Sequence, residues 1–379
     1  MSFVDRAVQC LAGAAVGDAL GGATEGFEAH EIAAHYGGPV TGVVESIRRA
    51  TNTVKLISPF WKGDGHVTDD TLMTRVLVRA YAAKRDHLDA YDMERYVVPA
   101  LVDEPMWIPE LDREDLLYQR LFLAEKWLVL RLRHGHVDPR DAGIGNIVNC
   151  GAAMYIAPVG LINASDPEGA YAEAIALTDA HQSSYGREAA GVLAAAVAAA
   201  ASPGADPTSV VDASLRLAKD ATRDAIEAVT EAAADLDGWR DGGLAVLRAA
   251  FAPFDSVGES YAEPGPDART PSRTHSIEEV PLALGFLVAT RGDYLEAMLG
   301  GVNYGRDSDS IASMAGALAG ALGSAPPGEL VKQVATASKL DLEEPGQTIA
   351  EVAKEILARD AERLQRRFDA AGIPSAVPV

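Results

Sequence analysis

Apolar residues recur at helical spacing along almost the whole chain, and this periodicity constrains the fold more than any other feature. Convincing alternation of apolar and polar residues, which is typical of half-buried strands, is absent, although 40–44 could form a short extended piece. The sequence therefore predicts an all-α protein. The predicted helical stripes lie at 4–15, 72–80, 116–132, 170–180, 187–201, 221–236 and 348–371.

The connections between these segments favour a single domain. The Gly- and Pro-rich stretches are short and only weakly biased in composition, so none is typical of an interdomain linker. They lie at 37–39, 202–207, 263–271 and 324–328. No internal repeat is present, and 379 residues are enough to bury a sizeable core. We expect one compact domain over 1–379, with a C-terminal helix at about 348–371 packing on it.

Composition excludes several classes of partner. The formal net charge of −22 argues against general binding to nucleic acids or anionic membranes. The start of the chain lacks the pattern of a signal peptide, and the most apolar stretch, 189–201, is too short to span a bilayer. Cys10 and Cys150 are far apart and form no CxxC pair, so neither a disulfide scaffold nor a zinc site is indicated. We expect a cytoplasmic protein; nothing in the sequence indicates its oligomeric state.

Two acidic clusters on distant parts of the chain carry the main functional signal. They are Thr68-Asp69-Asp70-Thr71 and Asp307-Ser308-Asp309-Ser310, and each opens an apolar, helix-patterned run. Capping of a helix start by Thr68 and the two following carboxylates would explain the first cluster alone. Taken together, the clusters supply the carboxylate and hydroxyl oxygens that hard divalent cations prefer.

Gathering the four carboxylates of the two clusters would cost energy without a cation. A like-charge pair about 4 Å apart costs about 4 kcal/mol at an effective dielectric constant near 20. Two divalent ions would turn this repulsion into attraction. Neither cluster has the twelve-residue loop of an EF-hand. We therefore predict a site for two Mg²⁺ or Mn²⁺ ions.

Further acidic residues have two interpretations each. Asp18 interrupts an apolar helix, and a structural carboxylate that accepts from backbone amides is the favoured reading. Glu25 lies in the Gly-rich turn 21–26, from which its carboxylate could reach a metal or a water, or simply face solvent. Glu278 and Glu279 are expected to be acids in the first turn of a helix.

Three motifs in this order resemble those of the ADP-ribosylglycohydrolase family over roughly residues 5–325. They are Gly17-Asp18-Ala19-Leu20-Gly21 with Glu25, the cluster 68–71, and the segment 305–317 that contains the second cluster. The resemblance implies an all-α, orthogonal helical fold with a binuclear Mg²⁺ or Mn²⁺ centre. It also implies the metal ligands Thr68, Asp69, Asp70, Asp307, Asp309 and Ser310, where Ser310 replaces the usual Thr. The implied catalytic residues are Glu25, Asp69 and Asp307.

The substrate-binding half departs from the family pattern. Cys150 stands where the family has Asn, Tyr155 where it has Arg, and Asp179 where it has the first His of a Thr-His-x-His motif. The resemblance places substrate contacts at Cys150, Gly151, Tyr155 and His181. Arg306, which replaces a common Gly beside the second cluster, could offset the charge of that cluster or reach an anionic substrate. These exchanges suggest that the chemistry is kept and the substrate differs, although neutral drift would also explain them. The loss of an Arg and a His makes a large, doubly phosphorylated ligand less expected.

These observations lead to a hydrolase that cleaves an N- or O-ribosyl bond. Its substrate would be an ADP-ribosyl group linked to a protein, as the resemblance implies, or a smaller riboside. Two alternatives stay open. One is a non-catalytic, metal-dependent protein that binds ribose or ADP-ribose, and the other is a two-metal phosphatase.

Overall fold

Helices build most of the computed structural model, which describes residues 1–50, 63–258, 261 and 276–374. The prediction of an all-α protein is therefore confirmed. The α-helices are α1 (Phe3–Gly21), α2 (Ala29–Tyr36), α3 (Ile47–Ala50), α4 (Asp69–Lys84), α5 (Ala90–Asp92), α6 (Val98–Val102), α7 (Leu123–Val129), α8 (Ala157–Ile162), α9 (Pro167–Thr178), α10 (Ser184–Ala200), α11 (Pro207–Leu217), α12 (Asp220–Ala234), α13 (Gly243–Phe251), α14 (Glu279–Ala289), α15 (Tyr294–Tyr304), α16 (Ser308–Leu322), α17 (Gly328–Ser338) and α18 (Glu344–Ala371). Short 3₁₀ or π segments are η1 (Met93–Val97), η2 (Pro109–Leu111), η3 (Leu117–Gln119), η4 (Leu130–His134), η5 (Pro139–Asp141), η6 (Cys150–Ala152) and η7 (Ala252–Phe254).

One small hairpin is the only strand pair in the described part of the chain. β1 (Pro105–Ile108) and β2 (Arg113–Leu116) are antiparallel, with Pro105 opposite Leu116. The prediction of one continuous helix over 116–132 is wrong in its first half, because Leu116 ends β2 and η3 follows. The Leu-rich pattern there reflects burial from an irregular backbone, since Leu117 and Leu121 are almost fully buried.

The piece at 40–44 forms no strand. Its backbone is instead held by the side chain of Asn303 on α15. The Val40 amide donates to Asn303 Oδ1 at 2.7 Å, and Asn303 Nδ2 donates to the Val40 carbonyl at 2.8 Å. A side-chain amide thus satisfies both backbone groups that a neighbouring strand would otherwise satisfy.

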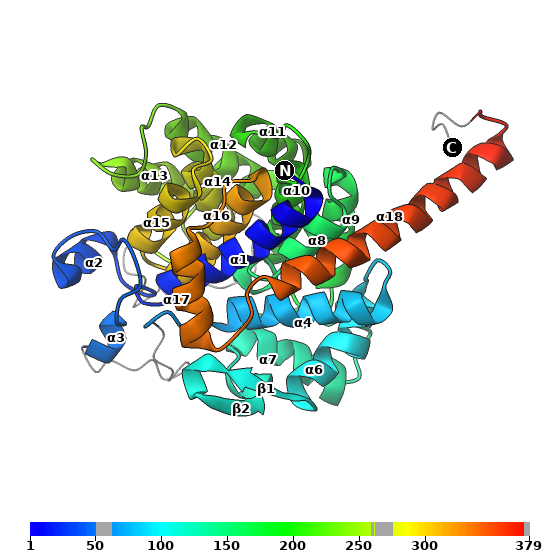
Figure 1. The fold of residues 1–379 in the computed structure, drawn as a ribbon, viewed down its shortest axis with the longest axis horizontal. Helices are drawn as coiled ribbons and strands as arrows, with labels where there is room; N and C mark the ends of the chain where they lie inside the picture. Colours follow the sequence, from blue (N-terminus) through cyan, green and yellow to red (C-terminus); the bar gives the residue numbers. More distant parts are fainter. Residues whose placement is uncertain (51–62, 259–260, 262–275, 375–379) are drawn as a thin grey trace.

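Helices α1 and α16, from opposite ends of the chain, pack side by side at the centre of the molecule (Figure 1). Small residues make this close approach possible. A Cβ atom at Gly17 would lie 2.2 Å from the carbonyl oxygen of Ala312, and one at Gly21 would lie 2.3 Å from that of Ser308. The helices run antiparallel, so the end of α1 meets the start of α16. This contact brings the first and third motifs together.

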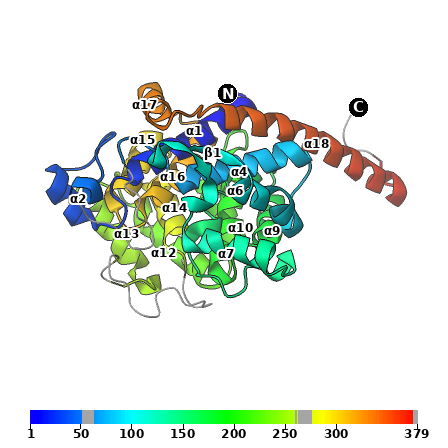
Figure 2. The same ribbon diagram turned by 90° about the horizontal axis from the view of Figure 1, so that it is seen from below.

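The last helix, α18, packs on the body with its first half and leaves it with its second half. Both views show this (Figures 1 and 2). Ile349, Val352 and Ile356 are buried, whereas Leu357 and Leu364 are exposed. The helix begins at Glu344, earlier than the predicted 348. The expected connection at 263–271 lies outside the described residues, and no described helix is long and apolar enough to cross a membrane.

Candidate metal centre

The start of α4 is fixed to α1 by the carboxylate of Asp18. Its Oδ2 accepts hydrogen bonds from the backbone amides of Thr68 and Thr71 at 2.9 and 3.2 Å, and from the Thr71 hydroxyl. Thr68 caps the helix, and its hydroxyl accepts from the amide of Asp70. The structural role favoured for Asp18 is therefore present. The result is that the first acidic cluster is held against the end of α1.

The start of α16 meets the same place. The Ser310 hydroxyl donates to Asp70 Oδ1 at 3.0 Å, which joins the two clusters directly. The Ser308 hydroxyl donates to the Gly21 carbonyl at 2.8 Å, and so anchors the second cluster to the end of α1. Three helix ends, from α1, α4 and α16, thus converge on one buried polar centre.

Carboxylates gather at this centre in two adjoining groups. Asp18, Asp70 and Asp309 each offer an oxygen, and these atoms lie within 4.8 Å of one another. Glu25, Asp307 and Asp309 form the second group by the same measure. Asp309 belongs to both groups, so the two groups share one residue. This arrangement suits a pair of divalent cations with a bridging carboxylate.

The pKa values of two of these carboxyl groups are raised, because burial and neighbouring negative charges disfavour the ionised form. The pKa of Asp70 is raised well above its ordinary value, first by burial and then by the charges of Asp309 and Asp18. The pKa of Asp307 is raised to about 7, first by burial and then by Asp309 and Glu25. Such groups bind protons or metal cations in place of solvent. The residues present therefore fit divalent cations.

The carboxylate of Asp69 belongs to neither of these two groups and is bound by an arginine. It forms an ion pair with Arg120 at 3.0 Å, and Arg120 pairs in turn with Glu110. Arg120 is only 2% exposed, so this guanidinium places a positive charge in the wall of the centre. The structure thus brings Glu25, Asp70, Asp307, Asp309 and Ser310 together, and holds Asp69 beside them on Arg120.

Cys150 and Glu279 complete a third group with Asp307, in which the ligand atoms again lie within 4.8 Å of one another. The Cys150 thiol donates to Asp307 Oδ2 at 3.0 Å and lies 3.4 Å from the Ser310 hydroxyl. Cys150 begins η6, and Glu279 begins α14. Glu279 is thus a first-turn acid as expected, but its carboxyl is buried at the centre and not on the surface.

A second buried cluster lies next to the metal centre. The Tyr155 hydroxyl and His181 Nδ1 are 2.9 Å apart, and His181 Nε2 lies 3.6 Å from Glu125 Oε1. Burial lowers the pKa of His181 to about 4. The pKa of Glu125 is raised to about 8, first by burial and then by the charge of Asp69. Both shifts favour the neutral forms of the two groups.

Gly151 allows the Glu125 side chain to reach this position. A Cβ atom at Gly151 would lie 2.2 Å from Glu125 Oε1, far inside van der Waals contact. The exchanged residue Asp179, by contrast, forms an ion pair with Arg187. Of the exchanged positions, Cys150 contacts the metal centre, Tyr155 lies in the adjoining buried cluster, and Asp179 binds a partially exposed arginine.

Arg306 holds the loop that carries Glu25. Its guanidinium, which has no exposed surface, pairs with Glu278 at 2.8 Å and Asp255 at 3.1 Å. Its backbone amide donates to the Phe27 carbonyl, and its carbonyl accepts from the Gly26 amide. This makes Arg306 a residue that positions the 25–28 loop. Its contact with a substrate stays a prediction.

Glu125, Glu279 and Arg120 lie outside the predicted set of site residues. Glu125 had a local signal, since it interrupts the apolar run from Leu121 to Leu132. Glu279 is the first residue of α14, whose other residues are apolar, so its buried carboxyl needs a partner. Arg120 had no comparable signal, because its partner Asp69 is 51 positions away in the sequence.

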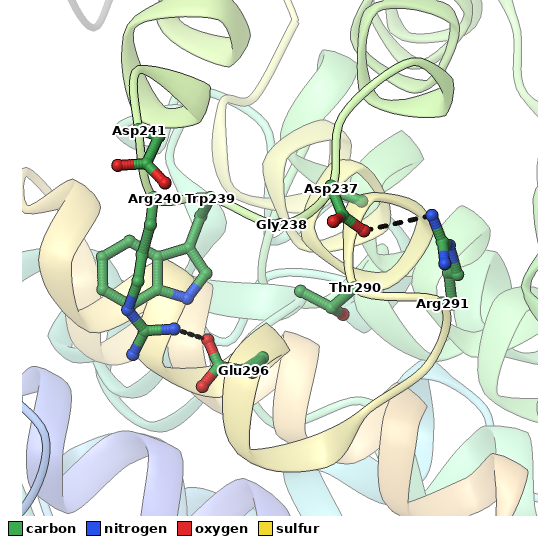
Figure 3. A pocket seen from close by; sticks show the side chains of 9 residues that line it. Asp237, Gly238, Trp239, Arg240, Asp241, Thr290, Arg291 and Glu296 are labelled. Atoms are coloured by element: carbon green, nitrogen blue, oxygen red, sulfur yellow. Dashed lines mark hydrogen bonds and ion pairs between the residues drawn. The ribbon is translucent and has the colours of Figure 1, made fainter.

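One surface cavity lies apart from the acidic centre. It has a volume of about 350 Å³ and is formed by the α12–α13 connection and the α14–α15 turn. Arg240 pairs with Glu296 and Arg291 with Asp237 across its rim (Figure 3). Glu279 and this cavity lie at opposite ends of α14, ten residues apart, which is about 15 Å at the rise of an α-helix. No residue of the acidic centre lines the cavity.

Fold and site together define an all-α protein with a buried acidic centre that can hold divalent cations. The chain belongs to the ADP-ribosylglycohydrolase family, whose model matches residues 1–366. This membership supports a hydrolase of the glycohydrolase class. No curated protein matches the chain.

A solved structure described as an ADP-ribosylglycohydrolase-related protein complex has a similar fold. Its TM-score is 0.58 at 20% sequence identity, and the match covers 93% of this chain and 99% of that one. At this identity the likeness concerns the fold alone. It agrees with the fold type that the motifs imply.

Proposed function

We propose that the protein is a binuclear Mg²⁺- or Mn²⁺-dependent glycohydrolase that cleaves an N- or O-ribosyl bond. The observation that carries the proposal is the convergence of Glu25, Asp307 and Asp309 beside Asp18, Asp70 and Asp309. Asp70, Asp307, Asp309 and Ser310 would hold the cations, with Thr68 and Asp69 at the edge of the set. When bound, the cations would supply a binding point for the cis-diol of ribose and a water of lowered pKa.

Glu25 is the residue proposed to take the proton of the attacking water. Glu25 lies on a loop that is hydrogen-bonded to both the backbone amide and the backbone carbonyl of Arg306. Its carboxylate faces those of Asp307 and Asp309. A proton acceptor has to lie within hydrogen-bond reach of the proton it takes, and a fixed loop satisfies this better than a free one. Asp307 would orient the water together with Glu25. The centre differs from that of common glycosidases, in which two carboxylates act without metal ions.

The substrate class is the finer part of the proposal. Two features support a riboside smaller than a protein-linked ADP-ribosyl group. Tyr155, which stands at the family's Arg position, is 1% exposed and faces His181. The Arg306 guanidinium is already paired with Glu278 and Asp255. Neither side chain is placed to hold a pyrophosphate. We propose that the protein acts in the cytoplasm, as the two separate, free cysteines suggest.

Activity assays on variants test the proposal. Purified protein is stripped of metal, reconstituted with Mg²⁺ or Mn²⁺, and assayed on small ribosides and on peptides ADP-ribosylated at arginine or serine. Asp307→Ala and Asp69→Ala should each abolish turnover while circular dichroism shows unchanged helicity. Asp224→Asn, at an exposed position on α12, is the matched control and should retain full activity.

The same assay separates the alternatives. Tight, metal-dependent binding of a riboside without turnover would indicate a binding protein. Release of phosphate from nucleotides would indicate a phosphatase. Unchanged turnover in either the Asp307 or the Asp69 variant would remove the glycohydrolase proposal.

A further inference from the structure

A sulfur atom lies in the wall of the acidic centre. Cys150, Glu279 and Asp307 come from three separate segments, η6, α14 and the residue before α16, yet their ligand atoms lie within 4.8 Å of one another. The Cys150 sulfur and Asp307 Oδ2 are 3.0 Å apart. The groups formed by Asp18, Asp70 and Asp309, and by Glu25, Asp307 and Asp309, contain only oxygen donors. The centre therefore has chemically different sides.

Glu279 gives independent evidence for a ligand on the sulfur side. It is 8% exposed, and its Oε2 has no hydrogen-bond partner among the described residues. Leaving a buried carboxylate oxygen without a partner is costly, so such an atom usually serves a proton, a water or a cation. The ligand oxygen of Glu279 lies within 4.8 Å of that of Asp307, so the two carboxyls need a shared proton or a cation between them.

We propose that Cys150, Glu279 and Asp307 form a cation position with a thiolate ligand, which takes a thiophilic divalent ion such as Zn²⁺, Fe²⁺, Co²⁺ or Cd²⁺ in preference to Mg²⁺. The reason is that soft thiolate ligands select these ions, whereas hard Mg²⁺ prefers oxygen. Three protein ligands with a remaining open position is also the arrangement of catalytic zinc sites. This inference deepens the proposed function, because it shares Asp307 with the proposed binuclear centre.

Binding at this position exchanges a proton for the metal. The Cys150 S–H bond, which donates to Asp307 in the metal-free protein, is broken, a sulfur–metal bond forms, and the proton goes to solvent. No electron transfer is needed. An Asn at this position could not make such a bond, so the exchange at Cys150 gives this chain a ligand that the family motif lacks.

Absorption spectroscopy tests the assignment without any substrate. Metal-free protein is titrated with Co²⁺ and with Cd²⁺, and the sulfur-to-metal charge-transfer band in the ultraviolet is followed. We expect the band in the wild type and in Cys10→Ala, because Cys10, the other cysteine, is buried in α1 and belongs to none of the described groups. Cys150→Ser should lose the band.

A second variant distinguishes a built site from a lone thiol. Glu279→Gln keeps the cysteine but replaces a carboxylate ligand by an amide. We expect it to weaken Cd²⁺ binding at least about tenfold, the lower end of the effect of losing even an outer partner of a metal ligand. Binding of Mg²⁺, measured by calorimetry, should change much less in both variants.

Two results would overturn the inference. One is a folded wild-type protein that binds Cd²⁺ without a charge-transfer band, which would leave Cys150 as a hydrogen-bond donor to Asp307. The other is an unchanged Cd²⁺ affinity in Glu279→Gln. The proposed function is tested separately. A protein that shows the band but cleaves no riboside would support this cation position and contradict the proposed function. A protein that cleaves ribosides without the band would support the proposed function and contradict this cation position.

Discussion

The hydroxyl of Ser310 donates to the carboxylate of Asp70 across 240 positions of sequence, at 3.0 Å. The same hydroxyl lies 3.4 Å from the sulfur of Cys150. Ser310 therefore stands between the all-oxygen groups and the sulfur-containing group. The fold gathers these donors from the starts of α4, α16 and η6. The cost of this assembly is electrostatic, and it leads to the first prediction.

Asp70→Asn should stabilise the metal-free protein and weaken its binding of metal. Asp70 is buried beside Asp309 and Asp18, and burial and these charges raise its pKa. Removing one carboxylate relieves repulsion that reaches about 4 kcal/mol for a pair at 4 Å, so a gain on the order of 1 kcal/mol in the free energy of unfolding is expected. Urea denaturation with a chelator measures the gain, and calorimetry with Mn²⁺ measures the lost affinity.

The exposed Asp224 on α12 provides the control for this prediction. Asp224→Asn removes the same charge from the surface, where it should change neither stability nor metal binding. If Asp70→Asn destabilises the metal-free protein, the buried carboxylates do not repel one another as the geometry implies.

Gly17→Ala should damage the metal centre from a distance by separating α1 from α16. The new Cβ would lie 2.2 Å from the Ala312 carbonyl oxygen, and this backbone atom cannot move without shifting the helix. Overpacking of this kind costs about 1–3 kcal/mol or more. Thermal unfolding and Mn²⁺ affinity should both fall. Gly328→Ala, where nothing lies within 4 Å of the new atom, should leave both unchanged.

His87 connects α18 to the body and should make this contact depend on pH. Its Nδ1 lies 2.6 Å from Glu173 and its Nε2 lies 2.8 Å from Asp360 on α18. The hydrogen bond with Glu173 is the largest of the causes that raise its pKa from 6.5 to about 9. A raised histidine pKa means that the stabilisation is fully present below pH 6.5 and is lost as pH rises through about 9.

Hydrogen exchange of α18 amides across this pH range checks the prediction. Protection should fall toward pH 9 in the wild type and should be low and independent of this transition in His87→Gln. His134→Gln, at an exposed histidine, should behave like the wild type. Equal protection of α18 at both ends of the range in the wild type would show that this histidine does not anchor the helix.

Local signals predicted several of the longer helices and the acidic clusters, because each depends on residues close in sequence. The apolar stripe of α1 and the Thr68 cap of α4 are signals of this kind. The hairpin of β1 and β2 was not predicted, since strand pairing depends strongly on tertiary context. The same limit applies to Arg306, whose partners Glu278 and Asp255 are 28 and 51 positions away.

Glu125 shows what only the fold could reveal. Its position in a Leu-rich run indicates a buried residue, but its nearness to Asp69 and His181 follows from tertiary packing. Tyr155, at the family's Arg position, also lies in this cluster, and burial together with Glu125 raises its pKa. An arginine there would supply a charge partner for Glu125. With tyrosine in its place, burial and the charge of Asp69 raise the pKa of Glu125 and favour its protonated form.

Glu125→Gln should therefore flatten the dependence of stability on pH in the metal-free protein. The pKa of Glu125 is raised from 4.5 to about 8 by burial and by Asp69. A carboxyl with a raised pKa contributes stability that is fully present below pH 4.5 and is lost as pH rises through about 8. Glutamine has a similar shape to the protonated acid and does not titrate.

Urea denaturation with a chelator across this pH range measures the effect. The free energy of unfolding should decline less with pH in the variant than in the wild type. Glu114→Gln, at an exposed position on β2, should follow the wild type. Parallel curves for wild type and Glu125→Gln would mean that the pKa of Glu125 is not raised and that its carboxyl is already ionised at neutral pH.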